Sequence, residues 1–519
     1  MPETRKPYPF LTLDPLTLNG TGARGATDFS PVSGLLSPPH SAVTKPKSPL
    51  SPLSPGFTRI LHRARSLTSL GSKRSKRPDA GIAYRLPPEL WIKVFMHIPL
   101  YLLPAVTLTC RSFNILAQPL LFSTISTHPA ASPSLALRGP QTSKYRKRIS
   151  ERLEFFFSPR ISPSIVECWI SPPAPEEDAP TDDIIDTIFD SLSHLPNLKK
   201  LSCRYVRLTP RRLSVLQNLQ LTTISLESCF GEIADFAAAP SVPLQEVTFK
   251  YPDAALRRGK ACLLFLSPTH LEQLHATTTS ILPILSQSPP FKKLRSLDIP
   301  IECITSDLLI PALLRCPVVD HLSLHTTDCI PRSLMESLPE GVLPLLSSYS
   351  GPHYFAAPFL RGRNAKTVDI SVPCKPHGLA VSLVRLDRSL MSLSFLLEGV
   401  ELPAPLLGTI HHSFPTLKKL AVGQPALASA EINAVLQAVP RHYTLSEITL
   451  HIQGRDKFNL WIPPDEAAAD AVSCFSKCRA ALLQTYPSLQ VVRLMHGSQG
   501  ARVMWRRSAL SGLFVQVAA

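Results

Sequence analysis

The most regular feature of the sequence is a short apolar motif that returns about every 25 residues. The motif is apolar-x-x-apolar-x-apolar, and it begins at Leu198. Its second apolar positions are Leu201, Ile224, Val247, Leu274, Leu297, Leu322, Val368, Leu393, Leu420, Ile448 and Val492. The interval from Leu322 to Val368 is twice the usual length and holds a degraded copy at Leu343-x-x-Leu346. Leu201 to Ile448 is then ten steps over 247 residues. Alternation of this kind predicts a short strand in every copy.

The segments between these copies predict helices. Thr209 and Pro210 suit the cap and first turn of one helix. Further helices are expected over 305–314, with Leu308, Leu309 and Leu313 on its inner side, over 431–439 and over 467–483. One strand–helix unit is too small to bury its own apolar side, so the units must stack into an α/β solenoid. The period and motif resemble those of leucine-rich repeats. The usual Asn or Cys after each strand is clear only at Cys229.

A second apolar stretch, Leu86 to Ile125, precedes the repeats and has a different period. Leu90, Val94 and Ile98 recur every four residues, which predicts a helix. Pro87 and Pro88 are placed where a first helical turn tolerates a missing N–H group, and Pro99 cannot continue the helix. Two further apolar runs, 102–108 and 113–121, predict two more short helices. Helices this short cannot bury so much apolar surface among themselves.

The residues of this stretch resemble an F-box. The family's Leu-Pro-x-Glu-Leu, apolar helix and Leu-x-Cys-Arg-x-aromatic segments are matched without a gap by Leu86, Pro87, Glu89, Leu90, Val94, Phe95, Ile98, Leu108, Cys110, Arg111 and Phe113. Four positions depart from the family: Pro99 and Leu102 replace acidic or capping residues, Thr109 a Val and Phe113 a Trp. The first two put the start of the second helix in question. The alternative is an ordinary helical hairpin at the edge of a domain.

The resemblance implies a function as a protein adaptor. An F-box docks on a Skp-family adaptor and through it on a cullin, so this chain would recruit substrates to an SCF-type ubiquitin ligase through its solenoid. The candidate adaptor-binding residues are Leu86, Pro87, Leu90, Val94, Phe95, Ile98, Leu108 and Phe113. Two alternatives are a scaffold that binds the adaptor without a cullin, and a nuclear leucine-rich-repeat protein that uses a basic tail on nucleic acid. Binding of the latter kind would weaken steeply with salt.

The charge of the chain is concentrated at its N-terminal end. The net charge is +16, and residues 1–82 carry 12 Lys and Arg against 4 Asp and Glu. This segment, rich in Pro and Ser, predicts a disordered tail. Its Ser-Pro pairs and the basic run Lys73–Arg77 suggest phosphorylation and nuclear import, although a plain solvated tail explains both. The rest of the chain is only mildly basic, so we do not expect it to bind nucleic acid.

The domain boundaries follow from these patterns. We expect the tail at 1–82, the F-box at 83–126, a connecting loop and helix at 127–160, and the solenoid at 161–519. Within the connection, 144–157 predicts an amphipathic helix. The first strand of the solenoid is expected at 165–170, before a Pro-rich acidic loop at 172–183.

Candidate chemistry is sparse. No Gly-rich phosphate loop and no Gly-x-Ser-x-Gly elbow occurs. Cys474 and Cys478 lack further ligands for zinc and predict buried small side chains, and His411-His412 predicts a polar loop. Asp182, Asp183 and Asp186 suit a helix start. We therefore expect no enzyme, no cofactor, no metal and no membrane span, in a protein of the cytoplasm, the nucleus or both.

Overall fold

The chain forms two compact units, residues 1–121 and 122–519. The computed structural model describes residues 86–127, 141–172, 182–229, 242–251, 265–301, 306–325, 338–339, 341–398, 402–427, 429–452, 464–496, 501–508 and 511–517. The predicted tail at 1–82, its Ser-Pro pairs and the Lys73–Arg77 run lie outside the described residues, as does most of the loop at 172–183.

The described part of the first unit is a small group of short helices. They are α2 (Pro88–Met96), the 3-10 helix η2 (Leu100–Leu102), α3 (Leu103–Thr107) and α4 (Arg111–Leu121). Pro87 is the N-cap of α2 and Pro88 its first residue, as the sequence predicts. Pro99 caps η2 without a side-chain hydrogen bond, so the second helical segment begins as a tight 3-10 turn.

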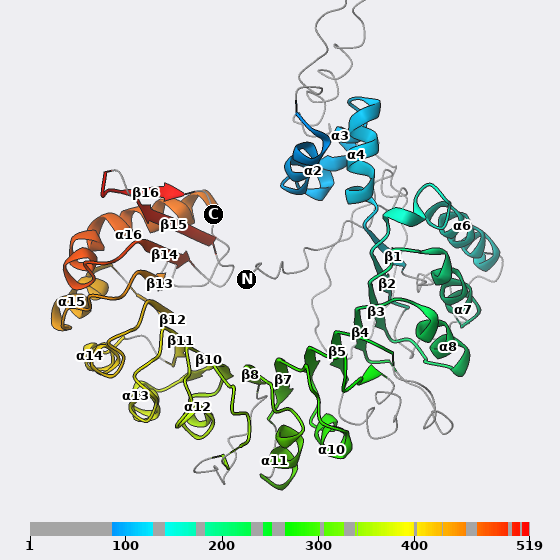
Figure 1. The fold of residues 1–519 in the computed structure, drawn as a ribbon. Coiled ribbons are helices and arrows are strands. Elements are labelled where there is room, and N and C mark those ends of the chain that lie inside the picture. Colours follow the sequence, from blue (N-terminus) through cyan, green and yellow to red (C-terminus); the bar gives the residue numbers. More distant parts are fainter. Residues whose placement is uncertain are drawn as a thin grey trace, which may run out of the picture. The chain divides into compact units, whose positions relative to one another are not determined.

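The second unit contains a sheet of sixteen strands that follow one another in chain order (Figure 1). The first fourteen strands pair in parallel, and β14, β15 and β16 pair antiparallel at the end. The strands are β1 (Thr124–Thr127), β2 (Glu167–Ile170), β3 (Lys200–Arg204), β4 (Thr223–Glu227), β5 (Glu246–Lys250), β6 (Gln273–Ala276), β7 (Ser296–Pro300), β8 (His321–His325), β9 (Ser348–Gly351), β10 (Thr367–Cys374), β11 (Ser392–Leu397), β12 (Lys419–Leu427), β13 (Glu447–Ile452), β14 (Val491–His496), β15 (Ala501–Arg507) and β16 (Phe514–Val517).

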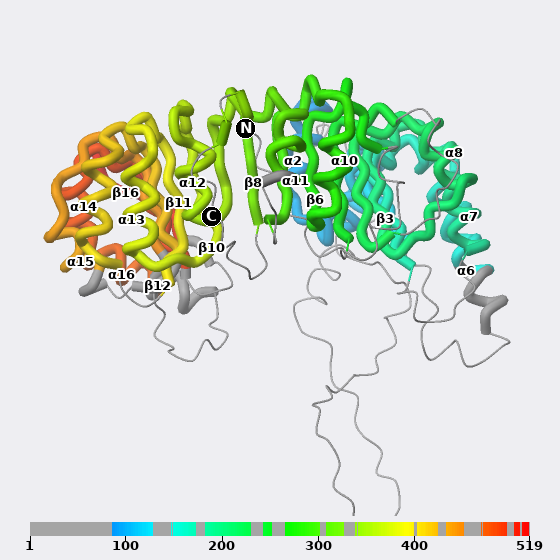
Figure 2. Tube along the Cα trace, turned by 90° about the horizontal axis from the view of Figure 1, so that it is seen from below, coloured from blue at the N-terminus to red at the C-terminus, as the bar shows by residue number. Residues whose placement is uncertain are grey.

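Helices connect the strands and lie on the outer side of this unit, while the strands line its inner side (Figure 1). They are α6 (Gln141–Phe156), α7 (Asp182–Ser191), α8 (Pro210–Asn218), α10 (Ile281–Gln287), α11 (Ser306–Leu314), α12 (His353–Leu360), α13 (Pro376–Val384), α14 (Ala404–Ser413), α15 (Ser429–Ala438) and α16 (Pro464–Thr485). Figure 2 shows the repeats side by side as successive coils. Because each coil packs on its neighbours, one apolar core runs between the strands and the helices.

The motif positions form a single in-register ladder across the sheet. Leu201 pairs with Ile224, Ile224 with Val247, and the same pairing continues to Val492 on β14. These side chains are buried, and the residues between them alternate to the other face of the sheet. The predicted α/β solenoid is therefore confirmed, together with its ten steps between Leu201 and Ile448.

Three details differ from the sequence expectations. The degraded copy is Leu346-x-x-Tyr349-x-Gly351, not Leu343-x-x-Leu346, because Tyr349 is the residue that pairs with Leu322 and Val368. The predicted strand at 165–170 is the second strand, since β1 pairs with it in parallel. Leu308 is exposed on α11, whereas Leu309 and Leu313 are buried as expected.

Several local predictions are confirmed. The Thr209 hydroxyl caps α8 by accepting a hydrogen bond from the Arg212 N–H group. The helix predicted at 144–157 is α6, and it lies between β1 and β2 within the second unit. The helices predicted at 431–439 and 467–483 correspond to α15 and α16. No helix among the described residues has the length and apolar character that crossing a membrane requires.

Candidate functional site

The eight residues proposed from the sequence divide into exposed and buried sets. Leu86, Pro87, Leu90, Val94 and Leu108 are exposed, Leu108 most strongly at 85%. Phe95 is buried at 2%, and Ile98 and Phe113 are half-buried beside it. The exposed set is free to meet a partner, whereas Phe95 belongs to the interior of the unit.

Helix α2 explains this division. Trp91, Phe95 and Ile98 follow one another at helical spacing and pack on the core residues Leu103 and Ala117. Leu90 and Val94 lie one turn apart on a neighbouring face, and both are exposed at 43%. The helix thus has apolar residues on two faces, and only one of these faces is used for folding.

Phe113 completes the interior from α4. Its ring lies 4.7 Å from that of Trp91 and 5.1 Å from that of Phe95, the second pair edge to face. The Phe113 N–H group donates to the Cys110 sulfur at 3.4 Å, which satisfies one donor at the start of α4. Cys110 therefore helps to begin this helix, and the packed ring of Phe113 anchors it.

Further exposed apolar side chains accompany the exposed members of the predicted set. They are Met96, Leu100, Tyr101, Leu102 and Ile115. We name Leu86, Leu90, Val94, Met96, Leu100, Tyr101, Leu102, Leu108 and Ile115 the exposed apolar set. Helical periodicity did not single out Leu100 and Tyr101, because η2 lies between two regular helices. So many exposed large apolar side chains in one small unit are typical of a protein-binding surface.

The strand face of the second unit carries a separate polar cluster at its centre. The Nδ1 atom of His325 on β8 lies 2.9 Å from one carboxylate oxygen of Asp298 on β7, and His275 on β6 bonds to the other oxygen. Burial raises the pKa of Asp298, but the hydrogen bonds from the two histidines outweigh it and hold that pKa well below its usual range. Since the carboxylate only accepts, both rings carry a proton on Nδ1.

This cluster was not anticipated, because its members are separated by more than twenty residues and meet only through the register of the strands. It contains two histidines and one carboxylate, and the Ser323 side chain also hydrogen-bonds to that carboxylate. In the described part of the chain no group of three or more His, Cys, Asp or Glu side chains is arranged to hold a metal ion.

The other residues that the sequence singled out take part in packing and in ion pairs of the second unit. Cys474 and Cys478 are buried along α16, as predicted. Asp182 and Asp186 on α7 both pair with the buried Arg212. The prediction of a polar loop at His411-His412 is wrong, because both residues lie in the last turn of α14 and His411 is buried.

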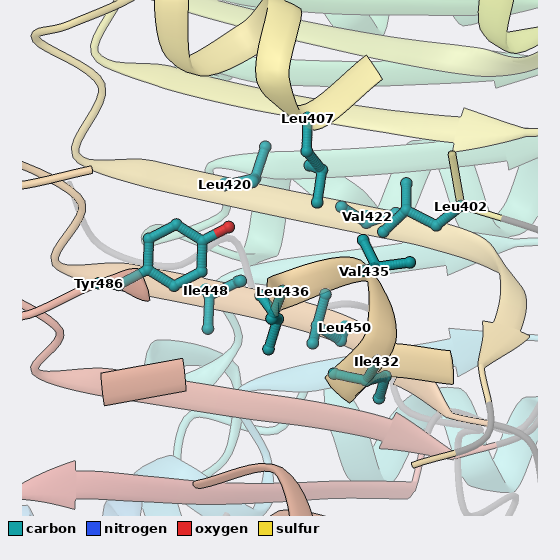
Figure 3. A pocket seen from close by; sticks show the side chains of 10 residues that line it. All are labelled: Leu402, Leu407, Leu420, Val422, Ile432, Val435, Leu436, Ile448, Leu450 and Tyr486. Atoms are coloured by element: carbon teal, nitrogen blue, oxygen red, sulfur yellow. The ribbon is translucent and has the colours of Figure 1, made fainter. Parts of the chain in front are cut away.

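An interior cavity near His411 is too small for a ligand. Its volume is about 10 Å³, and apolar side chains of the repeats around β12 and β13 line it together with Tyr486 (Figure 3). A cavity of this size and apolar lining stays dry. It is a packing defect of the core.

No family model matches the chain, and no curated protein matches its sequence. Among solved structures, the "Crystal structure of TLR13-ssRNA13 complex" aligns with a TM-score of 0.31 at 14% identity, over 66% of this chain and 44% of that chain. The alignment therefore spans less than half of that chain. The class of protein is defined by the strand ladder itself: a leucine-rich-repeat-like α/β solenoid preceded by a small helical unit.

Proposed function

We propose that this protein is the substrate-recruiting adaptor of an SCF-type ubiquitin ligase. The observation that carries the proposal is the exposed apolar set on a helical unit whose sequence matches the F-box pattern. Leu86, Leu90, Val94 and Leu108 belong both to that pattern and to the exposed set. They are the residues that would contact the Skp-family adaptor.

The energetics support a surface that is covered by a partner. Full burial of a Leu or Val side chain contributes about 1.5–3 kcal/mol. Most of the exposed apolar side chains of the helical unit are about half exposed, so a partner that covers them gains roughly half of this free energy for each, before the cost of association. Phe95 and Phe113 would act indirectly, by holding α2 and α4 together.

The solenoid would then hold the substrate. Its strand face presents alternate polar residues over many repeats, a large surface for protein recognition. The chain itself would do no chemistry. Holding a substrate lysine near a ubiquitin-loaded enzyme raises the effective concentration of the two reactants.

The test is a pull-down of purified Skp-family adaptor and cullin with the full chain. We expect wild type to retain both, and Leu90→Ala/Val94→Ala to lose both while keeping its thermal unfolding midpoint. Leu308→Ala/Leu314→Ala is the matched control, since it removes exposed apolar side chains from α11 of the solenoid. Retention of the adaptor without cullin would establish the scaffold instead. Failure to bind either protein would refute the proposal.

A further inference from the structure

A groove on the outer side of the solenoid runs along helix α14. Its volume is about 550 Å³, and it is lined by Val384, Leu386, Arg388, Pro405, Gly408, Thr409, His412 and Ser413. This volume is within the range of ligand-binding clefts, about 300–1,000 Å³. Its lining residues belong to α14 and to α13 and the segment after it. These two helices are neighbours on the outer side of the second unit (Figure 1).

Small residues on α14 make this space. Its five lining residues fall at positions i, i+3, i+4, i+7 and i+8, which is one face of the helix. Gly408 is at the middle of that face, and a Cβ atom added there would meet no atom within 4 Å. A larger side chain at this position would therefore occupy the groove without disturbing the helix.

The end of α13 and the residues after it form the other wall, which is apolar at Val384 and Leu386 and carries Arg388 further along. Val384 is 63% exposed at the rim, and Val381 is exposed one turn earlier. Leu386 is buried. An apolar side chain of a partner would therefore replace water over Val384 and Pro405.

Of the four polar side chains in the lining, the Thr409 hydroxyl donates to the Pro405 carbonyl at 2.9 Å, and the other three have no partner among the described residues. Among the described residues, no hydrogen bond or ion pair engages the Arg388 guanidinium, the His412 ring or the Ser413 hydroxyl. The Arg388 backbone is fixed, because its carbonyl accepts a hydrogen bond from the Thr416 hydroxyl at 2.9 Å. The neighbouring Asp387 is outside the lining, and its carboxylate accepts from the Ser389 N–H group. The lining thus has one cation and no acid.

We propose that this groove binds a peptide segment of a partner protein in which an apolar side chain adjoins an Asp or Glu. The apolar side chain covers Val384 and Pro405, and the carboxylate pairs with Arg388, whose planar fork of donors fits a carboxylate. The proposal concerns the outer side of the solenoid and does not depend on the adaptor function of the helical unit.

The test uses a random dodecamer peptide library displayed on phage and panned on the full chain. Gly408→Leu, which places a bulky side chain in the middle of the groove, serves for counter-selection. We expect the enriched peptides to carry Asp or Glu beside Leu, Ile or Phe. A labelled copy of the most enriched peptide should bind wild type saturably in fluorescence anisotropy, and at least about tenfold more weakly to Gly408→Leu and to Arg388→Glu.

Two matched variants act as controls. Arg385→Glu makes the same change of charge three residues from Arg388, outside the lining. Ala434→Leu adds one carbon atom less than Gly408→Leu, at an exposed position on α15. Both should bind within about threefold of wild type. Equal binding to wild type and Gly408→Leu would overturn the proposal. So would enrichment of basic peptides or of none, or an equal loss in Arg385→Glu and Arg388→Glu.

Discussion

His411 and Tyr486 are 75 residues apart in the sequence, yet the Tyr486 hydroxyl donates to Nε2 of His411 across 3.3 Å in the core of the solenoid. The other ring nitrogen of His411, Nδ1, donates to the Pro440 carbonyl at 3.0 Å. The two bonds fix a neutral ring with its proton on Nδ1. His442 lies beside it at 4.8 Å between ring centroids and donates from Nε2 to the Phe414 carbonyl.

This pair predicts a loss of stability in acid. Burial, followed by the neighbouring His442, lowers the pKa of His411 to about 4, and burial lowers the pKa of His442 as well. An unfolded chain takes up protons at these rings below a pH of about 6.5, whereas the folded chain does not. The stability that depends on the neutral rings is therefore fully present above pH 6.5. It is lost as the pH drops toward 4, by about 3 kcal/mol for His411.

The measurement is the free energy of unfolding in urea between pH 7 and pH 4. His411→Gln should reduce this pH dependence, although it also lowers stability at pH 7 by removing a packed ring. His412→Gln, which changes an exposed ring one residue away, should leave the dependence as it is in wild type. An unchanged dependence in His411→Gln would mean that other groups cause the acid sensitivity.

Arg212 predicts a large effect of a single charged side chain. It is 1% exposed, and its guanidinium donates to Asp182, Asp186 and the Arg207 carbonyl. Arg212→Met leaves these acceptors without their donor, so we expect a loss of about 3–5 kcal/mol in the free energy of unfolding. The control is the neighbouring Arg211→Met, which removes an exposed pair with Asp190 and should cost less than about 1 kcal/mol. Similar losses in both variants would contradict the prediction.

Two glycines predict opposite responses to the same substitution. At Gly351, φ is +153°, and an added Cβ would lie 2.8 Å from the Leu324 carbonyl oxygen, so Gly351→Ala should destabilise the β8–β9 region by about 2 kcal/mol. Gly408 is helical with open space around it, so Gly408→Ala should stabilise by about 0.5–1 kcal/mol. Thermal unfolding of the two variants decides the matter, and a stabilised Gly351→Ala would refute the assignment of strain.

The helical unit predicts a separation between stability and binding. Phe95→Ala removes the central ring from a core of few residues and should destabilise this unit by about 3–5 kcal/mol. Leu90→Ala removes an exposed side chain and should change stability by less than about 0.5 kcal/mol. Unfolding followed by circular dichroism measures the stability of each variant, and the adaptor pull-down measures its binding. Equal destabilisation by the two substitutions would show that Leu90 is part of the core.

The sequence predicted the parts of the fold that depend on local pattern. The ladder from Leu201 to Ile448 and the cap at Thr209 each follow from residues a few positions apart. Tyr349 was missed because an aromatic residue takes the place of the usual aliphatic one, and a Leu pair three residues earlier imitates the motif. β1 was missed because it joins the apolar stretch of the helices without a break in composition.

The polar contacts could not be predicted in the same way. Arg212 on α8 pairs with Asp182 and Asp186 on the preceding helix, α7. Asp298 on β7 binds histidines on the two neighbouring strands, β6 and β8. Such pairs depend on register, and register becomes known only when every strand is placed. For the candidate binding surface, the sequence identified the exposed Leu90 and Val94 but could not distinguish them from the buried Phe95.

The uniform register of the ladder makes the solenoid modular in length. Because Tyr349, Val368, Leu393 and Leu420 occupy equivalent positions on successive strands, the loss of one whole repeat brings equivalent residues together again. Removal of residues 368–392 places Leu393 next to Tyr349 with no change of register. Related chains can therefore differ by entire repeats while both ends of the sheet remain the same, and the length of the face can vary independently of the helical unit.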